Sequence, residues 1–266
     1  MSIPTGIGKL DRARITALLR GTQYTISINE AVKILQLPND HVAKLLARWS
    51  DKGWFARIKR GIYVAIPLES ATSDISLEDP FIIAQKIYGP CYIGGWSAAE
   101  YWGLTEQIFR TVVVFTVQKQ YNQHPDIKGT KFLLSKIPES FLFGLKSIWR
   151  GQIKVLISDP SRLIIDILNT PKLGGGIRSV ADIFVSYLNS EYKNLKLLAE
   201  YAKKFNNGAI YKRLGFLLEK FASEENSLIA LCSEELSFGN AKLDPQLECN
   251  HLITRWRLWV PESWKK

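Results

Sequence analysis

Pro38 separates two segments with helical periodicity, and this limits how the first quarter of the chain can fold. Proline lacks the backbone N–H that a helix interior needs, and its ring clashes with the preceding turn. Apolar residues recur at intervals of three and four on both sides of it: Ile28, Ala31, Val32 and Leu35, then Val42, Leu45, Leu46 and Trp49. The sequence therefore predicts two helices joined by a short turn.

The ends of these helices carry capping signals. Ser27 and Glu30 have the spacing of a capping box, which predicts that the first of the two helices starts after Ser27. Asn39 or Asp40 can cap the second. The preceding stretch "KLDRARITALLRG" predicts a further helix, closed by Gly21 in the left-handed conformation. We expect three helices.

A hairpin should follow the third helix. The stretch "WFARIKRGIYVAIP" contains two β-rich runs joined at Arg60 and Gly61, where glycine supplies the positive φ of a tight turn. Three helices followed by a basic hairpin is the order of a winged helix-turn-helix. We therefore expect an α+β protein with a winged helix-turn-helix in residues 1–72 and a larger mixed domain in residues 73–266.

Charge points to a polyanionic partner for the first of these domains. The net charge is +10, and residues 1–70 hold eleven Lys and Arg against five Asp and Glu. A recognition helix fits the DNA major groove, and hairpin cations can neutralise the adjoining phosphates. The candidate DNA-binding residues are Asn39, His41, Lys44 and Arg48 on the third helix, and Arg57, Lys59 and Arg60 on the hairpin. The alternative is a protein-contact module whose charged face is only solvated.

The rest of the chain predicts a small sheet with packed helices. Residues 67–80 are polar and acidic, so we expect a linker there and a second domain that begins near Asp79. Helical and strand patterns follow over 79–89 and 91–95, three β-rich runs over 111–118, 130–137 and 151–159, and four helical segments over 161–168, 179–188, 194–205 and 209–222. The tryptophan-rich tail, residues 251–266, fits either an edge strand or a partner contact.

The stretch "YIGGWSAAEYWGLTEQIF", residues 92–109, is rich in aromatic residues. Ser97 is a possible helix cap, and Trp96, Tyr101 and Leu104 can lie along one buried side. Aromatic residues at helical spacing occur more often in a core than around a ligand, so we expect a core segment.

No set of residues predicts catalysis or metal binding. Residues 173–179 are glycine-rich but lack the Gly-Lys-Ser/Thr ending of a P-loop, and they predict a turn before a helix that starts near Ser179. Cys249 and His251 have no second pair, so a zinc site is not expected. Asp159, Asp166 and Asp182 should cap helices or face solvent. We therefore expect no enzyme activity, no cofactor and no metal.

The three cysteines should be core thiols, because they are too few and too scattered for a disulfide framework. The apolar runs are too short to cross a bilayer, and no signal peptide is recognisable, so a cytoplasmic protein without a membrane partner is expected.

Four passages resemble the AbiEi family of antitoxins, which belong to abortive-infection, type IV toxin-antitoxin systems. They are "DKGWFARIKRGIYVAIP" at 51–67, "GWSAAEYWGLTEQ" at 95–107, "DPSRLIIDIL" at 159–168 and "AIYKRLGFLLEKF" at 209–221. The similarity spans the chain from about Ile28 to Phe221 in the family's order. Residues 222–266 match nothing in it.

The resemblance implies a non-enzymatic, two-part protein. Its winged helix would bind inverted repeats in its own promoter and repress transcription, through the basic residues already named. Its C-terminal domain would counter a nucleotidyltransferase toxin, without a stable direct complex being implied. Two alternatives stay open: an enzymatic antitoxin that modifies the toxin, and a ligand-sensing regulator whose pocket uses Trp96, Tyr101 and Trp102.

Overall fold

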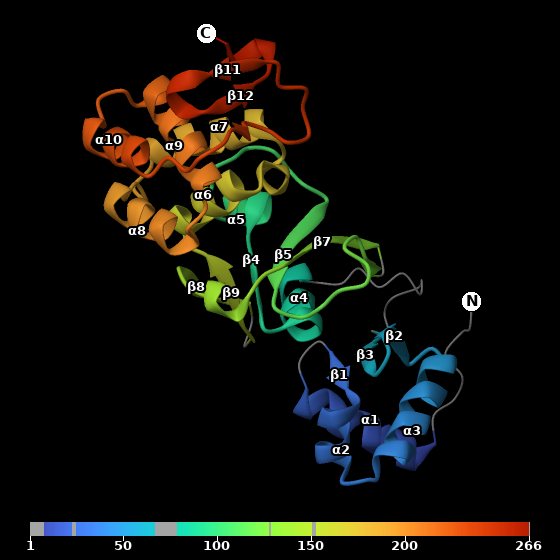
Figure 1. Cartoon of the computed structure of the whole chain (residues 1–266). Helices are drawn as coiled ribbons and strands as arrows, with labels where there is room; N and C mark the ends of the chain where they lie inside the picture. The colour runs from blue at the N-terminus through green and yellow to red at the C-terminus, as the bar shows by residue number, and fades with distance from the viewer. Residues whose placement is uncertain (1–7, 23–24, 67–78, 128, 151–152, 266) are drawn as a thin grey trace.

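The fold is a mixture of helices and small sheets, consistent with the expected α+β class (Figure 1). The structure is a computed structural model that describes residues 8–22, 25–66, 79–127, 129–150 and 153–265. The expected linker, and with it the boundary between residues 72 and 73, lies almost entirely outside these ranges. Among the described helices, none is both long and apolar enough to span a bilayer.

The N-terminal unit combines three helices with a three-stranded sheet. The helices are α1 (Lys9–Gly21), α2 (Ile28–Leu35) and α3 (Asn39–Asp51), and the strands are β1 (Ile26–Ser27), β2 (Phe55–Lys59) and β3 (Ile62–Ala65). The sheet is antiparallel in the order β1-β3-β2. The predicted helices and hairpin are confirmed. Strand β1 was not predicted, because two residues carry no recognisable pattern.

Local signals explain most of these boundaries. Ser27 and Glu30 form the predicted capping box at the start of α2, and Gly61 turns the hairpin with φ +80°. The predicted cap of α3 is wrong, because the helix begins at Asn39 itself and its N-cap is Pro38, which offers no side-chain hydrogen bond. Its start therefore depends on backbone geometry alone.

The prediction for Gly21 is also wrong. This glycine is the last residue of α1 and does not have a positive φ. A Cβ atom there would meet Ile34 Cδ1 at 2.9 Å, so the glycine lets α1 approach α2 closely. The residue was read as a helix stop, but its role is helix packing.

The C-terminal unit is built on a six-stranded sheet in the order β6-β7-β5-β4-β9-β8. Its strands are β4 (Cys91–Ile93), β5 (Thr111–Thr116), β6 (Asp126–Ile127), β7 (Thr130–Lys136), β8 (Leu145–Arg150) and β9 (Ile153–Ser158). The pairs β4–β9 and β5–β7 are parallel, and the others are antiparallel. Sequence patterns had predicted four of these strands and missed β6 and β8.

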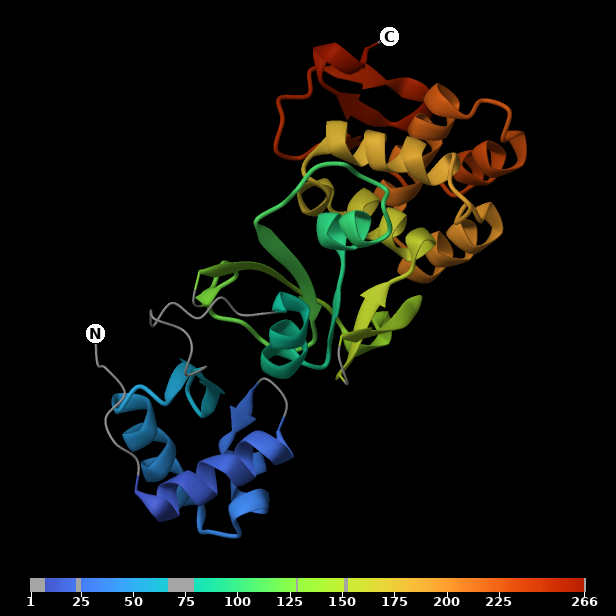
Figure 2. The same ribbon diagram turned by 180° about the vertical axis from the view of Figure 1, so that it is seen from behind.

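Helices pack against this sheet and against one another (Figure 2). They are α4 (Pro80–Tyr88), α5 (Gly95–Tyr101), α6 (Pro160–Asn169), α7 (Ile177–Leu188), α8 (Leu195–Phe205), α9 (Gly208–Phe221) and α10 (Asn226–Glu234). The polar linker pattern indeed gives way to a helix capped by Asp79. Helix α7 starts two residues before the predicted Ser179. Helix α10 was not predicted.

Ser97 does not cap α5, as the sequence suggested. The N-cap is Gly94, and the Ser97 hydroxyl instead accepts a hydrogen bond from the Val113 backbone N–H at 3.0 Å. This contact ties α5 to strand β5.

The C-terminal tail forms a second small sheet rather than an edge of the large one. Strands β10 (Ala241–Lys242), β11 (His251–Ile253) and β12 (Leu258–Val260) pair in the order β10-β12-β11. Trp256 is fully buried, and a Cβ atom on Gly215 of α9 would collide with its indole ring. The tail is therefore part of the core.

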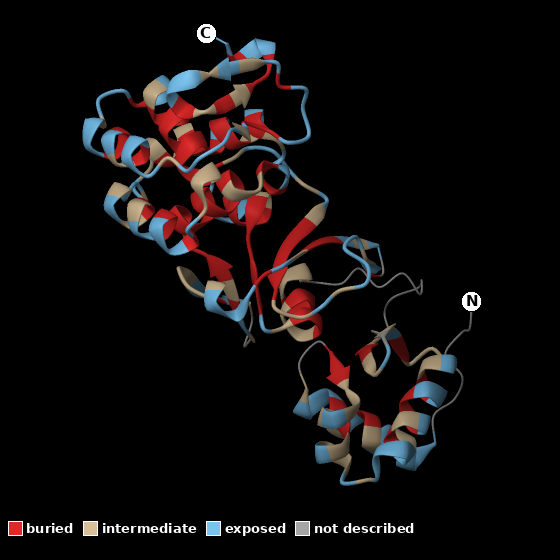
Figure 3. Ribbon diagram, in the orientation of Figure 1, coloured by how far each residue is buried: buried red, intermediate tan, exposed pale blue. Residues whose placement is uncertain are grey.

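The two units have separate cores that meet at the three-stranded sheet (Figure 3). Phe55 and Tyr63 lie in the N-terminal core, whereas their neighbours Ala56 and Val64 lie in the C-terminal core. Because side chains alternate along a strand, this sheet buries both of its faces. One further contact is the ion pair between Glu30 of α2 and Lys86 of α4, at 3.2 Å.

Candidate functional site

Helix α3 presents the polar face expected of it. Its inner face is the buried set Val42, Leu45, Leu46 and Trp49. Asn39, His41 and Lys44 are exposed on the outer face, and none of their side chains pairs with a described residue. Because these side chains are exposed, the outer face of α3 is accessible to a partner.

Arg48 differs from its neighbours on α3. Its Nη2 lies 2.8 Å from both carboxylate oxygens of Asp11 on α1. The Arg48 side chain remains half exposed. The candidate is therefore held by an intramolecular ion pair, which lowers its positive field and joins α1 to α3.

The hairpin candidates lie on β2 and in its turn. Arg57 and Arg60 are exposed, and the described residues offer neither of them an ion pair. Lys59 ends β2, opposite Ile62; its side chain lies outside the described part of the structure. Two of the three cations predicted for the hairpin, Arg57 and Arg60, are therefore exposed to solvent.

A basic face on α1 was missed by the sequence reasoning. Lys9, Arg12, Thr16 and Arg20 follow one another at intervals of three and four and are exposed. They line a shallow hollow of about 450 Å³ with Ala13 and Ala17 as its floor. Their helical spacing is a signal that the sequence itself carries.

The three aromatic residues of the alternative ligand pocket do not form one cluster: the rings of Tyr101 and Trp102 meet edge to face with centroids 4.9 Å apart, but Trp96 packs elsewhere. Trp96 stacks on Phe109 with ring centroids 4.9 Å apart and packs against a small second cluster of the C-terminal unit, around Val113 and Phe115. Trp102 packs against the main core of the C-terminal unit and contacts Tyr192. Of the residues predicted on the buried side, Leu104 is buried and Trp96 is partly buried, but the prediction is wrong for Tyr101, which is 39% exposed.

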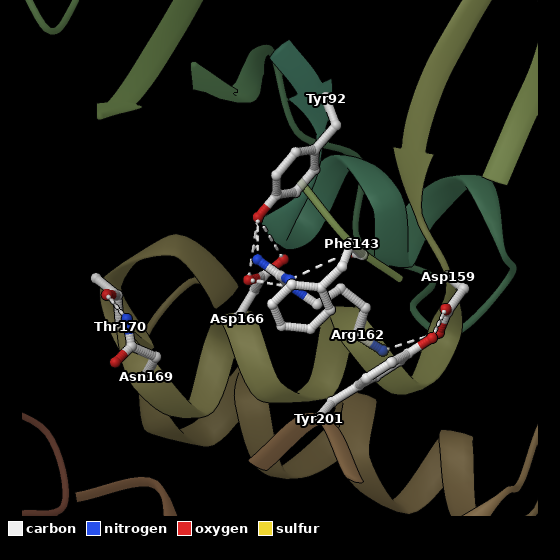
Figure 4. A network of polar contacts seen from close by, with 8 residues as sticks. All are labelled: Tyr92, Phe143, Asp159, Arg162, Asp166, Asn169, Thr170 and Tyr201. Atoms are coloured by element: carbon white, nitrogen blue, oxygen red, sulfur yellow. Dashed lines mark hydrogen bonds and ion pairs between the residues drawn. The ribbon is translucent and has the colours of Figure 1, made fainter. Parts of the chain in front are cut away.

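A buried polar network lies between β4, α6 and α8 (Figure 4). Arg162 Nε donates to Asp166 at 2.9 Å, and its Nη2 donates to the Tyr92 hydroxyl at 2.9 Å. The guanidinium also lies 4.2 Å from the Phe143 ring and 4.5 Å from the Phe205 ring. This set joins three elements through one cation.

Asp159 and Tyr201 extend the same network. Asp159 accepts from the Arg162 backbone N–H as the N-cap of α6 and from the Tyr201 hydroxyl at 2.8 Å. Its predicted capping role is confirmed. Asp166 was expected to cap or to face solvent, but it is buried because Arg162 and Tyr92 supply its hydrogen bonds.

Burial sets the protonation behaviour of this network. Desolvation raises the pKa of Asp166 to about 6, although Arg162 and its hydrogen bonds oppose the shift. Perturbed carboxyl groups often mark active sites. Here the side chains of Arg162 and Asp166 are 0% and 1% exposed, so substrate has no access and the network is structural.

Other polar candidates also have structural partners. The Asp244 carboxylate accepts a hydrogen bond from the Ile177 backbone N–H at the start of α7, at 2.9 Å. This N–H, which follows the glycine-rich turn, is therefore already bonded within the protein. His251 pairs with Glu262. All three cysteines are buried and free, as predicted. Within the described ranges, no three His, Cys, Asp or Glu side chains are grouped to hold a metal ion.

No protein-family model matches the chain, and no curated protein sequence matches it.

Proposed function

We propose that this protein is a DNA-binding repressor of its own promoter and an antitoxin of the type IV class. Its N-terminal unit acts as a winged helix-turn-helix, with α3 in the major groove and the β2–β3 hairpin beside the phosphates. The observation that carries the proposal is the exposed face of α3, where His41 and Lys44 stand without partners among the described side chains, on the same unit as exposed Arg57 and Arg60.

Charge and geometry support the DNA part. An exposed polar helix face can reach base edges, and separate cations can contact phosphates on either side. The antitoxin part rests on the resemblance to the AbiEi family alone, and it assigns to residues 73–266 the task of countering a nucleotidyltransferase toxin.

The DNA role is tested by mobility shift with the protein's own promoter fragment at several salt concentrations. Replacing Arg57, Lys59 and Arg60 together by alanine should weaken binding to all sequences and lower the salt slope by about 1 per lost phosphate contact. Replacing His41 or Lys44 by alanine should weaken binding to the promoter more than to random DNA.

Lys242→Ala is the matched control, because this exposed lysine lies in the small C-terminal sheet. Its affinity and salt slope should equal those of the wild type. An unchanged salt slope in the triple variant would remove the hairpin from the interface.

The antitoxin role is tested by co-expression with the neighbouring toxin gene. Growth is measured with the full chain, with residues 1–72 and with residues 73–266. Rescue by the full chain and by residues 73–266 is expected. Failure of every soluble form to rescue growth would leave a transcription regulator without antitoxin activity.

A further inference from the structure

The two edges of the six-stranded sheet differ in how they are protected. At one edge, β6 is two residues long, and the adjoining loop continues its cover of β7. There the Phe132 N–H donates to the Pro125 carbonyl and the Leu134 N–H to the Gln123 carbonyl. At the other edge, β9 is the only described strand that pairs with β8.

Among the described residues, strand β8 has no strand partner on its outer side over its whole length. It pairs with β9 in an unbroken register from Leu145 to Arg150, without a bulge and without proline. Apart from β9, no described residue hydrogen-bonds to the backbone of β8. Alternate residues of an edge strand direct N–H and C=O groups outward, so β8 can accept a further strand. Figure 1 shows β8 and β9 at the left side of the sheet.

A large exposed aromatic side chain lies on this edge. Trp149 is 68% exposed, and it stands opposite Lys154 of β9. A tryptophan buries a large apolar area when a partner covers it, and tryptophan is enriched among the residues that dominate protein interfaces. Its exposure, at an edge for which the described residues supply no further strand, indicates a surface that can bind a partner.

The charge beside this edge is positive. Lys146 and Lys154 are exposed, and neither forms an ion pair with a described residue. Arg150 lies at the end of β8 near Asp79, with Nε to Oδ2 at 3.5 Å. A strand that carries carboxylates would therefore meet complementary charge on both faces of β8.

A second copy of the chain would bring the same positive charge to the edge instead of a complementary one, and the like charges come closest in one register. Pairing two β8 strands about Ile148 would place Lys146 directly opposite Arg150 of the second copy. Like charges directly opposite each other destabilise an antiparallel pair.

We propose that β8 is a docking site for an extended acidic segment of another protein, which adds to the sheet as a seventh strand and covers Trp149. Backbone hydrogen bonds along residues 145–150 supply the affinity, and Lys146 and Lys154 select the charge. This site lies in the C-terminal unit and does not depend on DNA binding by α3.

The test uses the full chain and a blocked, fluorescein-labelled peptide of alternating Glu and Val, about as long as β8. Fluorescence anisotropy should detect its binding. Two further peptides isolate the causes: one replaces Glu with Lys, and one carries N-methyl groups on alternate backbone nitrogens. We expect both to bind at least about tenfold more weakly, because one reverses the charge and the other cannot form the ladder.

Trp149→Ala should weaken binding of the acidic peptide about tenfold or more. Phe238→Ala is the matched control, since Phe238 is 98% exposed and lies outside β8. Far-ultraviolet circular dichroism and the melting temperature should be the same for both variants and the wild type. Hydrogen exchange of the amides of residues 145–150 should slow when the acidic peptide is bound.

Four outcomes would overturn the proposal. The acidic peptide does not bind at about 1 mM, or the N-methylated peptide binds equally well, which would leave only surface charge. A single-stranded oligonucleotide binds in its place and loses affinity in Trp149→Ala, which would assign the surface to nucleic acid. Sedimentation shows a dimer that Trp149→Ala dissociates, which would make the partner a second copy.

Discussion

At the scale of single residues, the fold depends on a few side chains whose surroundings lie far away in the sequence. Arg162 is the clearest case, because it is fully buried and its charge is compensated by Asp166, Tyr92 and two aromatic rings. Removing one member of such a pair leaves an uncompensated buried charge, whereas replacing both by apolar groups is far less harmful.

We therefore predict that Arg162→Met or Asp166→Leu alone lowers the free energy of unfolding by about 3–5 kcal/mol. The double variant should recover a large part of that loss. Urea denaturation of the three variants measures this. Equal losses in the double variant and in the sum of the single variants would show that the two residues do not act as a pair.

The same network predicts a pH dependence. The pKa of Asp166 is about 6 in the folded chain, raised by burial from the ordinary value of 3.8. A raised pKa means that the folded state binds the proton more tightly. The contribution to stability is therefore complete below the ordinary value and is lost as pH rises through about 6.

Denaturation from pH 4 to pH 7 tests this, with the double variant as the reference. The wild type should lose stability relative to the double variant as the pH rises across that range. A constant difference between the two proteins would contradict the predicted protonation of Asp166.

Gly215 gives a second prediction at this scale. Its missing Cβ leaves room for the indole of Trp256, which lies against α9. Gly215→Ala should cost about 1–3 kcal/mol through overpacking. Gly8→Ala, where no atom lies within 4 Å, is the control without overpacking; because Gly8 is the N-cap of α1, it should cost at most about 1 kcal/mol.

At the scale of elements, the helices are joined by contacts that their own sequences only partly specify. The capping box of α2 is local and was predictable, because Ser27 and Glu30 are three residues apart. The ion pair between Asp11 and Arg48 joins α1 to α3 across 37 positions and was not predictable. The ion pair engages Arg48, a candidate DNA contact, but leaves its side chain half exposed.

If α3 binds DNA, Asp11→Asn should increase affinity. The substitution removes a carboxylate from a basic surface and releases Arg48 for a phosphate, so the salt slope should rise by about 1. The stability change should stay below about 1 kcal/mol, because the pair is partly exposed. Asp51→Asn is the control, because it removes one carboxylate from the end of α3 and Asp51 does not pair with Arg48. Equal effects of both variants would mean that only net charge matters.

At the scale of the whole molecule, the three-stranded sheet is the joint between two cores. Its helix-facing side belongs to the N-terminal core, and Ala56 and Val64 on its other side belong to the C-terminal core. A chain cut near residue 72 would therefore expose apolar side chains that the full chain covers.

We predict that residues 1–72 alone bind the dye ANS more strongly than the full chain does. Ile62→Thr together with Val64→Thr should reduce dye binding by the fragment, since both residues lie on the covered face. The same double variant should lower the melting temperature of the full chain. Weak dye binding by the unmodified fragment would mean that the sheet's outer face is not an interface between the cores.

The sequence by itself determined the elements whose signals are local: the helices on either side of Pro38, the hairpin at Gly61, and the strands and helices with strong apolar periodicity. It also identified the candidate cations of α3 and the hairpin, because charge and helical spacing are local properties. Short strands such as β1 and β6 form because a neighbouring strand supplies their hydrogen bonds, so their own residues carry no alternating pattern from which they could be predicted. The burial of Asp166, the pairing of Arg48 and the open edge at β8 depend on residues distant in the chain, and only the tertiary structure decided them.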